Sequence, residues 1–357
     1  MKYSTKLSMI VIALTLVISG CGKCKQGYQC NDTCCEEDQI CRDGSCCIWY
    51  EMESGTEANI NGIWGSQAND IFAVGGWCDW FTGSCGGGTV LHYDGNEWSK
   101  MDIVAEGAIF DIWGSSGSDV YAVGKNCCFD ETTISMLRCW GEIYHYDGQE
   151  WSQVDVGEKE PFYAMDGSSD LDIFVVGGRY DDYDEPSTTV LHFDGKEWTE
   201  MDSDFAIPLF DVWVDSAQDV FAVGAYYGDH ILIHYDGNEW KEMDTEGINA
   251  GYPTGVWGSS RSDVFVVKDG PILHYDGKTW EVMTYETRDL RGVWGSSETD
   301  VFAVGMNGRI FHYDGIKWCG TIYGDVKESY ETVWVAPNRE VFIGGSGGTI
   351  LRLSCPQ

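Results

Sequence analysis

Short apolar runs, each alternating with or bounded by polar residues, follow one another along most of the chain. Residues 62–101 hold four of them, with the sequences GIWGS, DIFAVG, TVLHY and EWSKM. Runs of this length between Gly, Ser and Asp predict β-strands. Asp94-Gly95 separates the last two runs and predicts a two-residue hairpin turn, because both residues tolerate positive φ.

The four-run unit recurs with a VWGSS-like start and an HYDG-x-x-W end. Seven starts are found, at Ile63, Ile112, Ala164, Val212, Val256, Val293 and Val333. Six ends are found, with the histidines His92, His145, His192, His234, His274 and His312. A ring of such four-stranded units buries the faces that a single sheet would leave exposed. The sequence therefore predicts an all-β fold, a seven-bladed β-propeller.

The seventh copy lacks an outer strand, because the chain reaches Gln357 soon after its third run. Before the first copy, Trp49 and Met52 have the Trp-x-x-Met spacing of Trp98 and Met101. We therefore expect 48–53 to be the outer strand of blade seven. The propeller then spans 48–357 and closes by pairing of its two ends, which leaves no free sheet edge.

The first 20 residues resemble the signal peptide of bacterial lipoproteins. Lys2 and Lys6 precede an apolar stretch, 9–18, that is too short to span a bilayer. The stretch ends in ISGC, which resembles a lipobox and implies removal of 1–20 and lipidation of Cys21. An ordinary cleaved signal is the alternative. The resemblance implies a cell-envelope lipoprotein whose only contact with the membrane is its lipid anchor. Because Gly22 rather than Asp follows Cys21, the resemblance implies the outer membrane, on its periplasmic side or at the cell surface.

The other cysteines fit an oxidising compartment, since 14 of the 15 remain after Cys21. Seven lie in 24–47, and the first six resemble the spacing of inhibitor cystine knots, so 21–47 is expected to be a small disulfide-rich stalk, knotted or otherwise. Cys355 aligns with a turn glycine of the other copies, and a bridge to Cys47 would restore the hairpin that the chain break removes. Cys319 competes for Cys355. The other expected bridges are Cys78–Cys85 and Cys139 with Cys127 or Cys128.

The chain is strongly acidic, with 22 Lys and Arg against 58 Asp and Glu and a formal net charge of −36. This charge disfavours nucleic acid and anionic lipid surfaces as partners. Cations, cationic peptides and neutral glycans remain. Solubility at a crowded surface, or a salt-adapted proteome, explains the acidity equally well.

Histidines and aspartates with a fixed place in the repeat are expected to be structural. The aspartates that open the second strand of a copy are expected to bond to the amides of the preceding turn. They are Asp70, Asp119, Asp172, Asp219, Asp263 and Asp300. No Ser–His–Asp set, HExxH motif or phosphate-binding glycine loop stands apart from the repeat, so no catalytic residue is assigned.

Two resemblances concern the repeat as a whole. The HYDG-x-x-W element is similar to the Asp-box of bacterial neuraminidase-type propellers, from which it differs by one residue between Asp and Gly. Over about 58–354 the chain more closely resembles the tandem VWGSxxxDVxAVG…HxDGxxW β-propeller lipoproteins of myxobacterial type. This resemblance implies a surface propeller and names no ligand.

Connections between the second and third strands vary in length, whereas the other turns do not. They are long at 76–88, 125–141 and 178–188 and intermediate at 225–229. Loops grafted on a constant scaffold usually carry function. Aromatic rings beside carboxylates suit a sugar ring or a cationic peptide. The expected ligand-binding residues are Trp77, Trp80, Phe81, Tyr180, Tyr183, Tyr226 and Tyr227. Asp181, Asp182, Asp184 and Glu185 form a candidate Ca²⁺ site, the one cofactor considered, with a solvated acidic loop as the alternative.

These features favour a non-catalytic recognition module that binds a protein or a glycan through the long loops of blades one to four. A glycan hydrolase or lyase, with Asp79 and Asp182 as acid and base, is one alternative. An envelope assembly factor is another. Binding is favoured over catalysis because the carboxylates outside the repeat lie on irregular loops, which are poorly suited to pre-organise a reaction.

Overall fold

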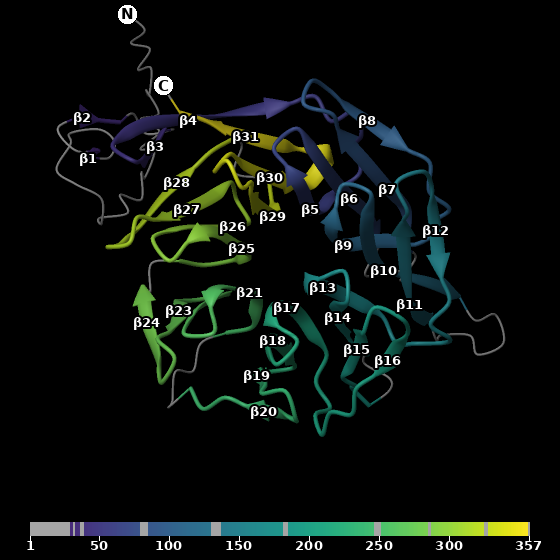
Figure 1. The fold of residues 1–357 in the computed structure, drawn as a ribbon. Coiled ribbons are helices and arrows are strands. Elements are labelled where there is room, and N and C mark those ends of the chain that lie inside the picture. The colour runs from purple at the N-terminus through teal and green to yellow at the C-terminus, as the bar shows by residue number, and fades with distance from the viewer. Residues whose placement is uncertain are drawn as a thin grey trace, which may run out of the picture.

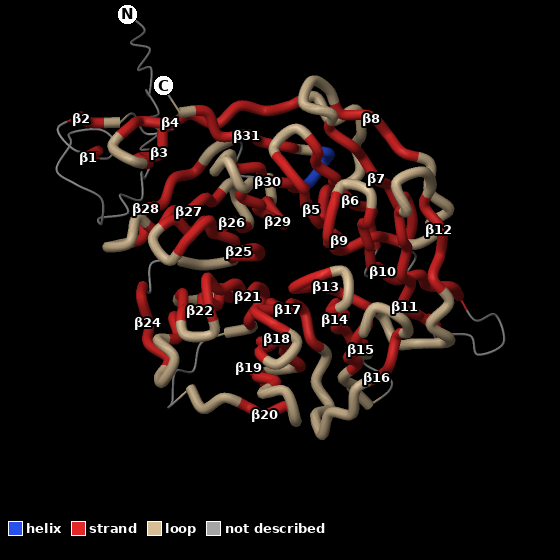
Figure 2. Tube along the Cα trace, viewed as in Figure 1, coloured by secondary structure: helices blue, strands red, loops and turns tan. Residues whose placement is uncertain are grey.

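The four runs of each repeat form four antiparallel strands, and seven such sheets close into a β-propeller in the computed structural model (Figure 1). The structure describes residues 29–30, 33–35, 39–78, 85–129, 137–180, 185–245, 251–284, 287–324 and 328–355. Strands and loops make up almost all of it (Figure 2), and the predicted all-β, seven-bladed fold is confirmed. Within the described residues, no helix is long and apolar enough to cross a membrane.

The strands of each blade run in order from the central axis to the rim (Figure 1). Blade one consists of β5 (Ile60–Gln67), β6 (Asp70–Cys78), β7 (Cys85–Tyr93) and β8 (Trp98–Met101). Blade two consists of β9 (Ala108–Ser116), β10 (Asp119–Phe129), β11 (Leu137–Tyr146) and β12 (Trp151–Val154). Blade three consists of β13 (Phe162–Ser169), β14 (Asp172–Gly177), β15 (Thr189–Phe193) and β16 (Trp198–Glu200).

Blade four consists of β17 (Leu209–Ser216), β18 (Asp219–Tyr226), β19 (Asp229–Tyr235) and β20 (Trp240–Glu242). Blade five consists of β21 (Pro253–Ser260), β22 (Asp263–Lys268), β23 (Ile272–Tyr275) and β24 (Trp280–Thr284). Blade six consists of β25 (Leu290–Ser297), β26 (Asp300–Gly305), β27 (Arg309–Tyr313) and β28 (Trp318–Ile322).

Blade seven joins the two ends of the chain. It consists of β29 (Tyr330–Val335), β30 (Val341–Gly345), β31 (Ile350–Ser354), β4 (Ser45–Met52) and β3 (Gln39–Arg42), with the 3₁₀ helix η1 (Ser346–Gly348) before β31. β4 pairs with β31 as the sequence predicts, and β3 adds a fifth strand outside it. β1 (Gln29–Cys30) and β2 (Thr33–Cys34) form a separate two-stranded sheet.

Disulfides hold both the closure and the extended hairpins. Cys47 and Cys355, with Cα atoms 4.2 Å apart, link the outer strand to the end of β31. Cys319 is therefore not the partner of Cys355, although it is also disulfide-bonded. Among the disulfides that the described residues show, two further bridges hold the long hairpins of blades one and two, and another lies in the N-terminal segment. They are Cys78–Cys85, Cys127–Cys139 and Cys35–Cys46, so that Cys139 pairs with Cys127 rather than with Cys128.

Packing between blades explains why glycine follows tryptophan in the repeat. A Cβ atom on Gly114 would lie 2.8 Å from the ring of Trp64 in the preceding blade, so only glycine leaves room for that ring. Gly65 receives Trp334 in the same way, across the junction of blades seven and one. At five of the seven junctions between blades, the tryptophan of one innermost strand thus packs on a glycine of the next.

Blade three departs from this rule, and the departure corrects the alignment made from the sequence. Asp166 pairs with Phe174 as Trp64 pairs with Phe72, so Asp166 stands in the place of the tryptophan. The alignment of Ala164 with the start of the repeat was therefore wrong by one residue. Blade four has Val214 where five of the blades have glycine, and its amide donates to the Asp166 carboxylate at 2.7 Å. A hydrogen bond replaces the ring contact here.

The turn between the third and fourth strands also differs from the prediction. Tyr93 pairs with Trp98, so the turn has four residues, and the expected two-residue hairpin is wrong. The Asp94 carboxylate accepts hydrogen bonds from the amides of Asn96 and Glu97, at 2.8 and 3.1 Å. These amides lower the pKa of Asp94. The aspartate of the HYDG motif is thus a turn cap, because its carboxylate satisfies two amides that the strands leave unpaired.

Candidate functional site

The repeated histidines and aspartates bind each other across the second and third strands. In blade one, Nε2 of His92 lies 2.8 Å from Oδ1 of Asp70, and the hydroxyl of Ser66 donates to Oδ2. The His92 ring also packs on Phe72, with centroids 4.7 Å apart. Equivalent pairs are His145–Asp119, His192–Asp172, His234–Asp219, His274–Asp263 and His312–Asp300.

This pairing corrects the prediction that the aspartates bond to turn amides. The register of the sheet places His92 of β7 opposite Phe72 of β6. The imidazole of His92 therefore reaches Asp70, which is the first residue of β6. The carboxylate lies between the Ser66 hydroxyl and the imidazole. The imidazole therefore does not accept the serine proton, as a Ser–His–Asp nucleophile would require. The cluster is a structural tie between strands, in agreement with its repetition.

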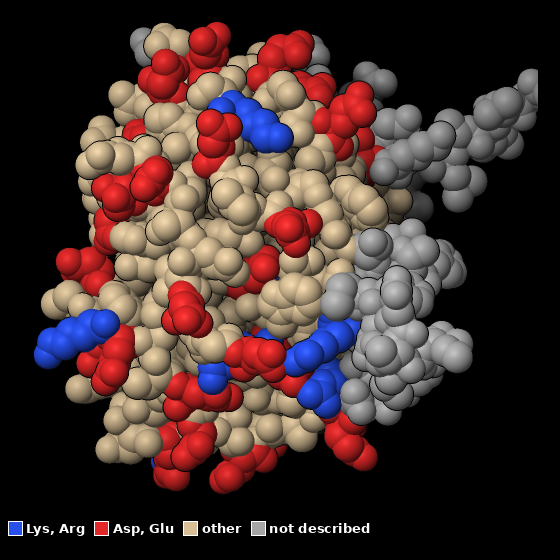
Figure 3. Space-filling view, turned by 90° about the vertical axis from the view of Figure 1, so that its right-hand side faces the viewer, with Lys and Arg blue, Asp and Glu red and all other residues tan. Residues whose placement is uncertain are grey.

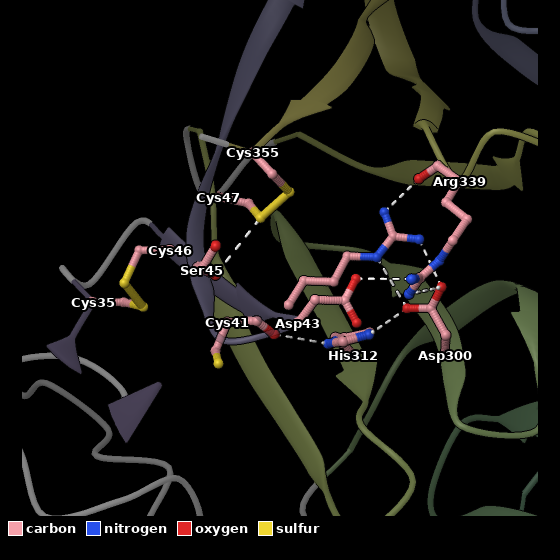
Figure 4. Close-up of a disulfide and its surroundings, with 11 residues drawn as sticks. Cys35, Cys41, Asp43, Ser45, Cys46, Cys47, Asp300, His312, Arg339 and Cys355 are labelled. Carbon is pink, nitrogen blue, oxygen red and sulfur yellow. Dashed lines mark hydrogen bonds and ion pairs between the residues drawn. A yellow bond between two sulfur atoms is a disulfide. The ribbon is translucent and has the colours of Figure 1, made fainter. Parts of the chain in front are cut away.

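In blade six an arginine from the N-terminal hairpin closes the cluster (Figure 4). Arg42 of β3 donates to both carboxylate oxygens of Asp300, at 3.1 Å from Nε and 2.6 Å from Nη2. Arg339 reaches the same carboxylate at 3.2 Å. His312 donates from Nδ1 to the carbonyl of Cys41 at 3.1 Å, and its side chain is 4% exposed. The β3–β4 hairpin, part of the segment expected to be a stalk, thus packs on the propeller.

Arg42 takes a place that a tyrosine fills in other blades. The ring of Phe72 in blade one packs against Tyr146 of blade two, with centroids 5.8 Å apart. Blade seven has Leu353 at the position of that tyrosine, opposite Trp49 as Tyr146 is opposite its own tryptophan. The Arg42 guanidinium lies 5.2 Å from the ring centroid of Phe302 instead. This cluster is therefore a docking contact within the fold rather than an open site.

A β-bulge in the innermost strand of every blade carries a residue that does not repeat. In blade three, Phe162 pairs with Gly177 and Ala164 with Val176, which leaves Tyr163 as the extra residue. The bulged residues of blades one to seven are Asn61, Phe110, Tyr163, Phe210, Thr254, Arg291 and Glu331. Bulges re-aim side chains and occur often beside functional sites. A variable residue at a fixed place in a repeat indicates a role beyond the scaffold.

Several of the bulged residues touch the bulged residue of a neighbouring blade. Blades two to four contribute aromatic rings, with centroids 5.8 Å apart for Phe110 and Tyr163 and 5.7 Å for Tyr163 and Phe210. The other blades contribute polar groups, and Nε of Arg291 lies 4.0 Å from a carboxylate oxygen of Glu331. The ring of bulges is therefore apolar on one side and polar on the other.

Three tyrosines predicted from the loops extend the aromatic side. Tyr180 of blade three lies 6.0 Å from Phe210, 5.4 Å from Tyr226 and 5.7 Å from Tyr227, measured between ring centroids. Tyr226 and Tyr227 lie 4.7 Å apart in the β18–β19 turn. We call the resulting surface on the long-loop face, the face of the connections between second and third strands, the aromatic stripe. Its members are Phe110, Tyr163, Phe210, Tyr180, Tyr226 and Tyr227.

Tyr227 holds a backbone conformation that large residues rarely adopt. Its φ is 41°, that of Gly228 is 104°, and the flanking residues Tyr226 and Asp229 pair directly. A two-residue turn with two positive φ angles favours Asn-Gly. A tyrosine at the first position costs on the order of 1 kcal/mol. Tyr227 is 58% exposed, so packing in the core does not explain why the chain keeps it.

A half-buried lysine and two half-buried aspartates lie along the stripe. Nζ of Lys125 is 5.6 Å from the ring centroids of both Phe110 and Tyr163, and burial lowers its pKa. Asp111 and Asp211 follow the bulged residues of blades two and four. Each accepts two backbone N–H groups, one of them from the next blade. Burial raises the pKa of Asp111 to about 7 and that of Asp211 well above its ordinary value.

The other residues predicted from the loops do not join the stripe. Trp77 is 49% exposed and lies over Gly87 in its own hairpin, and within the described part of the chain no ring contact links it to the tyrosines. Trp80, Phe81, Tyr183, Asp79, Asp181, Asp182 and Asp184 lie outside the described residues. Glu185 is described and exposed. Over the described ranges, no group of three or more His, Cys, Asp and Glu side chains could hold a metal ion.

Reasoning from loop lengths missed Phe110, Tyr163, Phe210 and Lys125. A signal for the first three was present, because the position three before the repeat tryptophan changes from Asn to Phe, Tyr, Thr, Arg and Glu at a fixed place in the repeat. Lys125 follows Gly124, a glycine of the repeat, and nothing in the repeat pattern marks it as a site residue.

Solved structures with the same fold are numerous, and three of them, all distant in sequence, illustrate the likeness. The structure of YCF48 bound to D1 peptide has 14% identity and a TM-score of 0.61, covering 85% of this chain and 96% of its own. The WD40 propeller domain of Doa1 has 13% identity and a TM-score of 0.63, with coverages of 85% and 95%. A streptogramin B lyase has 9% identity and a TM-score of 0.64, with coverages of 87% and 98%. No protein-family model and no curated protein sequence matches the chain, so these likenesses describe the fold alone.

Proposed function

We propose that this chain is a non-catalytic recognition module of the cell envelope, which binds a segment of a partner protein through the aromatic stripe. The observation that carries the proposal is Tyr227, an exposed ring held in a strained turn and stacked on Tyr180. Strain of this kind persists where function requires it. Tyrosines are also among the residues that contribute most to binding at protein interfaces.

The shape of the stripe favours a protein segment over a glycan. Successive ring planes cross at 70°, 52° and 78° from Tyr163 through Phe210 and Tyr180 to Tyr226. Rings at such angles form an uneven surface, whereas sugar rings stack on flat faces. The likeness to the structure of YCF48 with D1 peptide shows that a propeller of this architecture accommodates a peptide.

The repeated polar groups support the non-catalytic part of the proposal. The aspartate and histidine of each described cluster bond to each other between strands, and in five of the six clusters a serine hydroxyl donates to the same carboxylate. The rival acid–base pair, Asp79 and Asp182, lies outside the described residues. The similar lyases share only the fold with this chain.

The binding test compares the wild-type chain with Tyr180→Ala and Tyr227→Asn on peptide and glycan arrays. Both variants should lose peptide binding, whereas Tyr50→Asn should keep it, because Tyr50 is an exposed tyrosine on β4, at the rim of blade seven. Melting curves of all four proteins establish that they are folded. Retained binding by both stripe variants, or binding to glycans alone, would reject the proposed site. Turnover of a captured glycan would reject the non-catalytic assignment.

The envelope location rests on the lipobox-like sequence before Cys21 and on the disulfides, which suit an oxidising compartment. The variant Cys21→Ala should remain unprocessed or leave the membrane fraction, and it should take up no labelled fatty acid. Unchanged fatty-acid labelling of that variant would show that the anchor is elsewhere.

A further inference from the structure

Two disulfide bridges of neighbouring blades touch each other on the long-loop face. Cys78 of β6 pairs directly with Cys85 of β7 in blade one and is bonded to it. Cys127 of β10 pairs directly with Cys139 of β11 in blade two and is likewise bonded. The sulfur atoms of Cys85 and Cys127 lie 3.7 Å apart, across the boundary between the two blades. The two bridges therefore form one cluster of four sulfur atoms.

The bridges meet because their hairpins extend beyond those of most other blades. The second strand of blade three ends at Gly177, and that of blade six ends at Gly305. β6 and β10 instead run on past the equivalent glycines to Cys78 and Phe129. Adjacent extensions on one face bring the two bridges together. Holding a hairpin closed requires one bridge within it and no contact with a second one, so the contact indicates a further role.

The cluster can be reached from solvent. Cys78, Cys85 and Cys139 are half-buried, and Cys127 is 9% exposed. Thiol–disulfide exchange begins when a thiolate attacks one sulfur atom of a bridge. A reductant can therefore attack the bridge of blade one at Cys78, which sets free the sulfur atom of Cys85 that touches Cys127. A group held this close to its target reacts far faster than one in free solution.

The charge of the chain limits which reductant can approach. The net charge is −36, and on the side shown in Figure 3 acidic side chains are spread widely while basic ones are few. A negative surface repels anionic thiols and attracts basic proteins. The favoured reductant is therefore a dithiol that is neutral or is carried on a basic surface.

We propose that the two bridges act as one thiol–disulfide exchange unit, in which reduction of either hairpin forms a Cys85–Cys127 bridge between blades one and two. The dithiol first attacks Cys78, and Cys85 leaves as a thiolate. The dithiol then closes into its own disulfide and releases Cys78 as a thiol, so that it has given two electrons to the chain. The Cys85 thiolate attacks the sulfur atom of Cys127, and Cys139 leaves as a thiolate. This last step needs no further reagent, and the two protons of the dithiol end on Cys78 and Cys139.

The product joins the two blades and opens both hairpins. Each original bridge lies within one blade and separates its cysteines by 7 or 12 residues, whereas the new bridge spans 42. Attack on Cys139 leads to the same product, because Cys127 is then the thiolate that touches the bridge of blade one. One reduced bridge thus alters the long loops of both blades, and the exchange requires no ligand at the aromatic stripe.

The test leaves one thiol beside an intact bridge and needs no reductant. In Cys78→Ser, Cys85 should exchange with the bridge of blade two at pH ~8, where an appreciable share of an ordinary thiol is ionised. Acid quenching, labelling of free thiols and mass mapping of peptides should find label on Cys139 and a Cys85–Cys127 bridge. Cys139→Ser should form the same bridge and carry the label on Cys78.

A matched control frees a thiol on the opposite face of the ring. Cys47→Ser leaves Cys355 unpaired after the end of β31, where the other blades turn to their fourth strand. Label on Cys139 should be at least tenfold higher in Cys78→Ser than in this control. Melting curves establish that the variants are folded.

The wild type gives a second test that no substitution affects. One equivalent of dithiothreitol, a neutral dithiol, should convert part of it to the form with a Cys85–Cys127 bridge and free thiols at Cys78 and Cys139. Reduction of either hairpin without that bridge would overturn the proposal. A Cys85 thiol that stays free in Cys78→Ser, or that bonds to any cysteine other than Cys127, would overturn it as well.

Discussion

Replacing Arg42 by methionine should loosen the N-terminal hairpin from blade six. Methionine keeps much of the volume of the side chain but removes its two hydrogen bonds to Asp300 and the one to the carbonyl of Arg339. It also removes the guanidinium that covers the ring of Phe302. The Asp300 side chain is only 4% exposed and would keep its charge in a buried place.

The expected loss of unfolding free energy is about 3 kcal/mol. Removing one partner of a buried ion pair costs about 3–5 kcal/mol, because the other charge stays buried. The lower end applies here, since Arg339 and His312 remain bonded to Asp300. For a domain of this size the loss corresponds to a fall of roughly 6 °C in melting temperature.

The acid dependence of stability gives a second measure of the same contact. Burial by itself raises the pKa of Asp300, but hydrogen bonds from His312, Arg42 and Ser296 hold it well below its ordinary value. The folded carboxylate therefore contributes stability above pH ~4, and this contribution is lost as the pH falls below ~4. Arg42→Met should make the loss smaller, because the pKa of Asp300 then lies nearer to that of the unfolded chain.

Urea unfolding of the wild type, Arg42→Met, Asp300→Asn and the double variant at pH 7 and at pH ~2 measures both effects. Arg42→Lys is the matched control, since it keeps the charge and loses the paired geometry, and it should fall between wild type and Arg42→Met. The double variant should be more stable than the sum of the two single losses predicts. Strict additivity, or a loss below ~0.5 kcal/mol in Arg42→Met, would refute the assignment of this contact as the hairpin's anchor.

Three further predictions concern the carboxylates, the closure and the strained turn. Burial raises the pKa of Asp111 to about 7 and that of Asp166 to about 8, so between pH ~4 and these values the folded chain keeps protons that the unfolded chain has lost. The free energy of unfolding should therefore fall as the pH rises to ~8 and then level off, and the fall should be shallower in Asp166→Asn. A rise over this range would contradict the burial of these groups. Replacing Cys47 and Cys355 together by alanine should lower the free energy of unfolding in urea by about 5 kcal/mol, because the bridge spans 308 residues. An equal loss on replacing Cys78 and Cys85, whose bridge spans 7 residues, would argue against an effect of loop entropy. Tyr227→Asn should leave the melting temperature unchanged or raise it, since relief of about 1 kcal/mol of strain offsets the lost ring contacts, and a fall of several degrees would mean that the tyrosine is structural.

The number of blades and the way the ring closes could be predicted from the chain because both depend on local patterns. Strand periodicity is repeated seven times, and the Trp-x-x-Met spacing of Trp49 and Met52 is visible without any contact being known. The bridge between Cys47 and Cys355 was predicted from the same alignment, but only the structure excludes Cys319 as the partner of Cys355.

The hydrogen-bond partners within a blade could not be predicted, because they depend on strand register. Asp70 and His92 are both conspicuous in the repeat, but the pairing of β6 with β7 decides that the carboxylate bonds to the imidazole rather than to the nearby turn. Asp166 illustrates the same limit. Asp166 aligns with the tryptophan of the other blades only when the extra residue Tyr163 is counted in the pairing of β13 with β14.

The aromatic stripe depends on contacts between blades. Tyr180, Tyr226 and Tyr227 were identified from loop length, whereas Phe110, Tyr163 and Phe210 lie in three separate copies and look like ordinary strand residues. Closure of the ring sets neighbouring innermost strands side by side, and one extra residue in each strand turns these side chains toward the next blade. The pattern of apolar and polar residues determines the propeller, because each strand buries its own apolar face. The residues that form the stripe are determined by the extra residue of each bulge and by contacts between blades, and neither is visible in a single repeat.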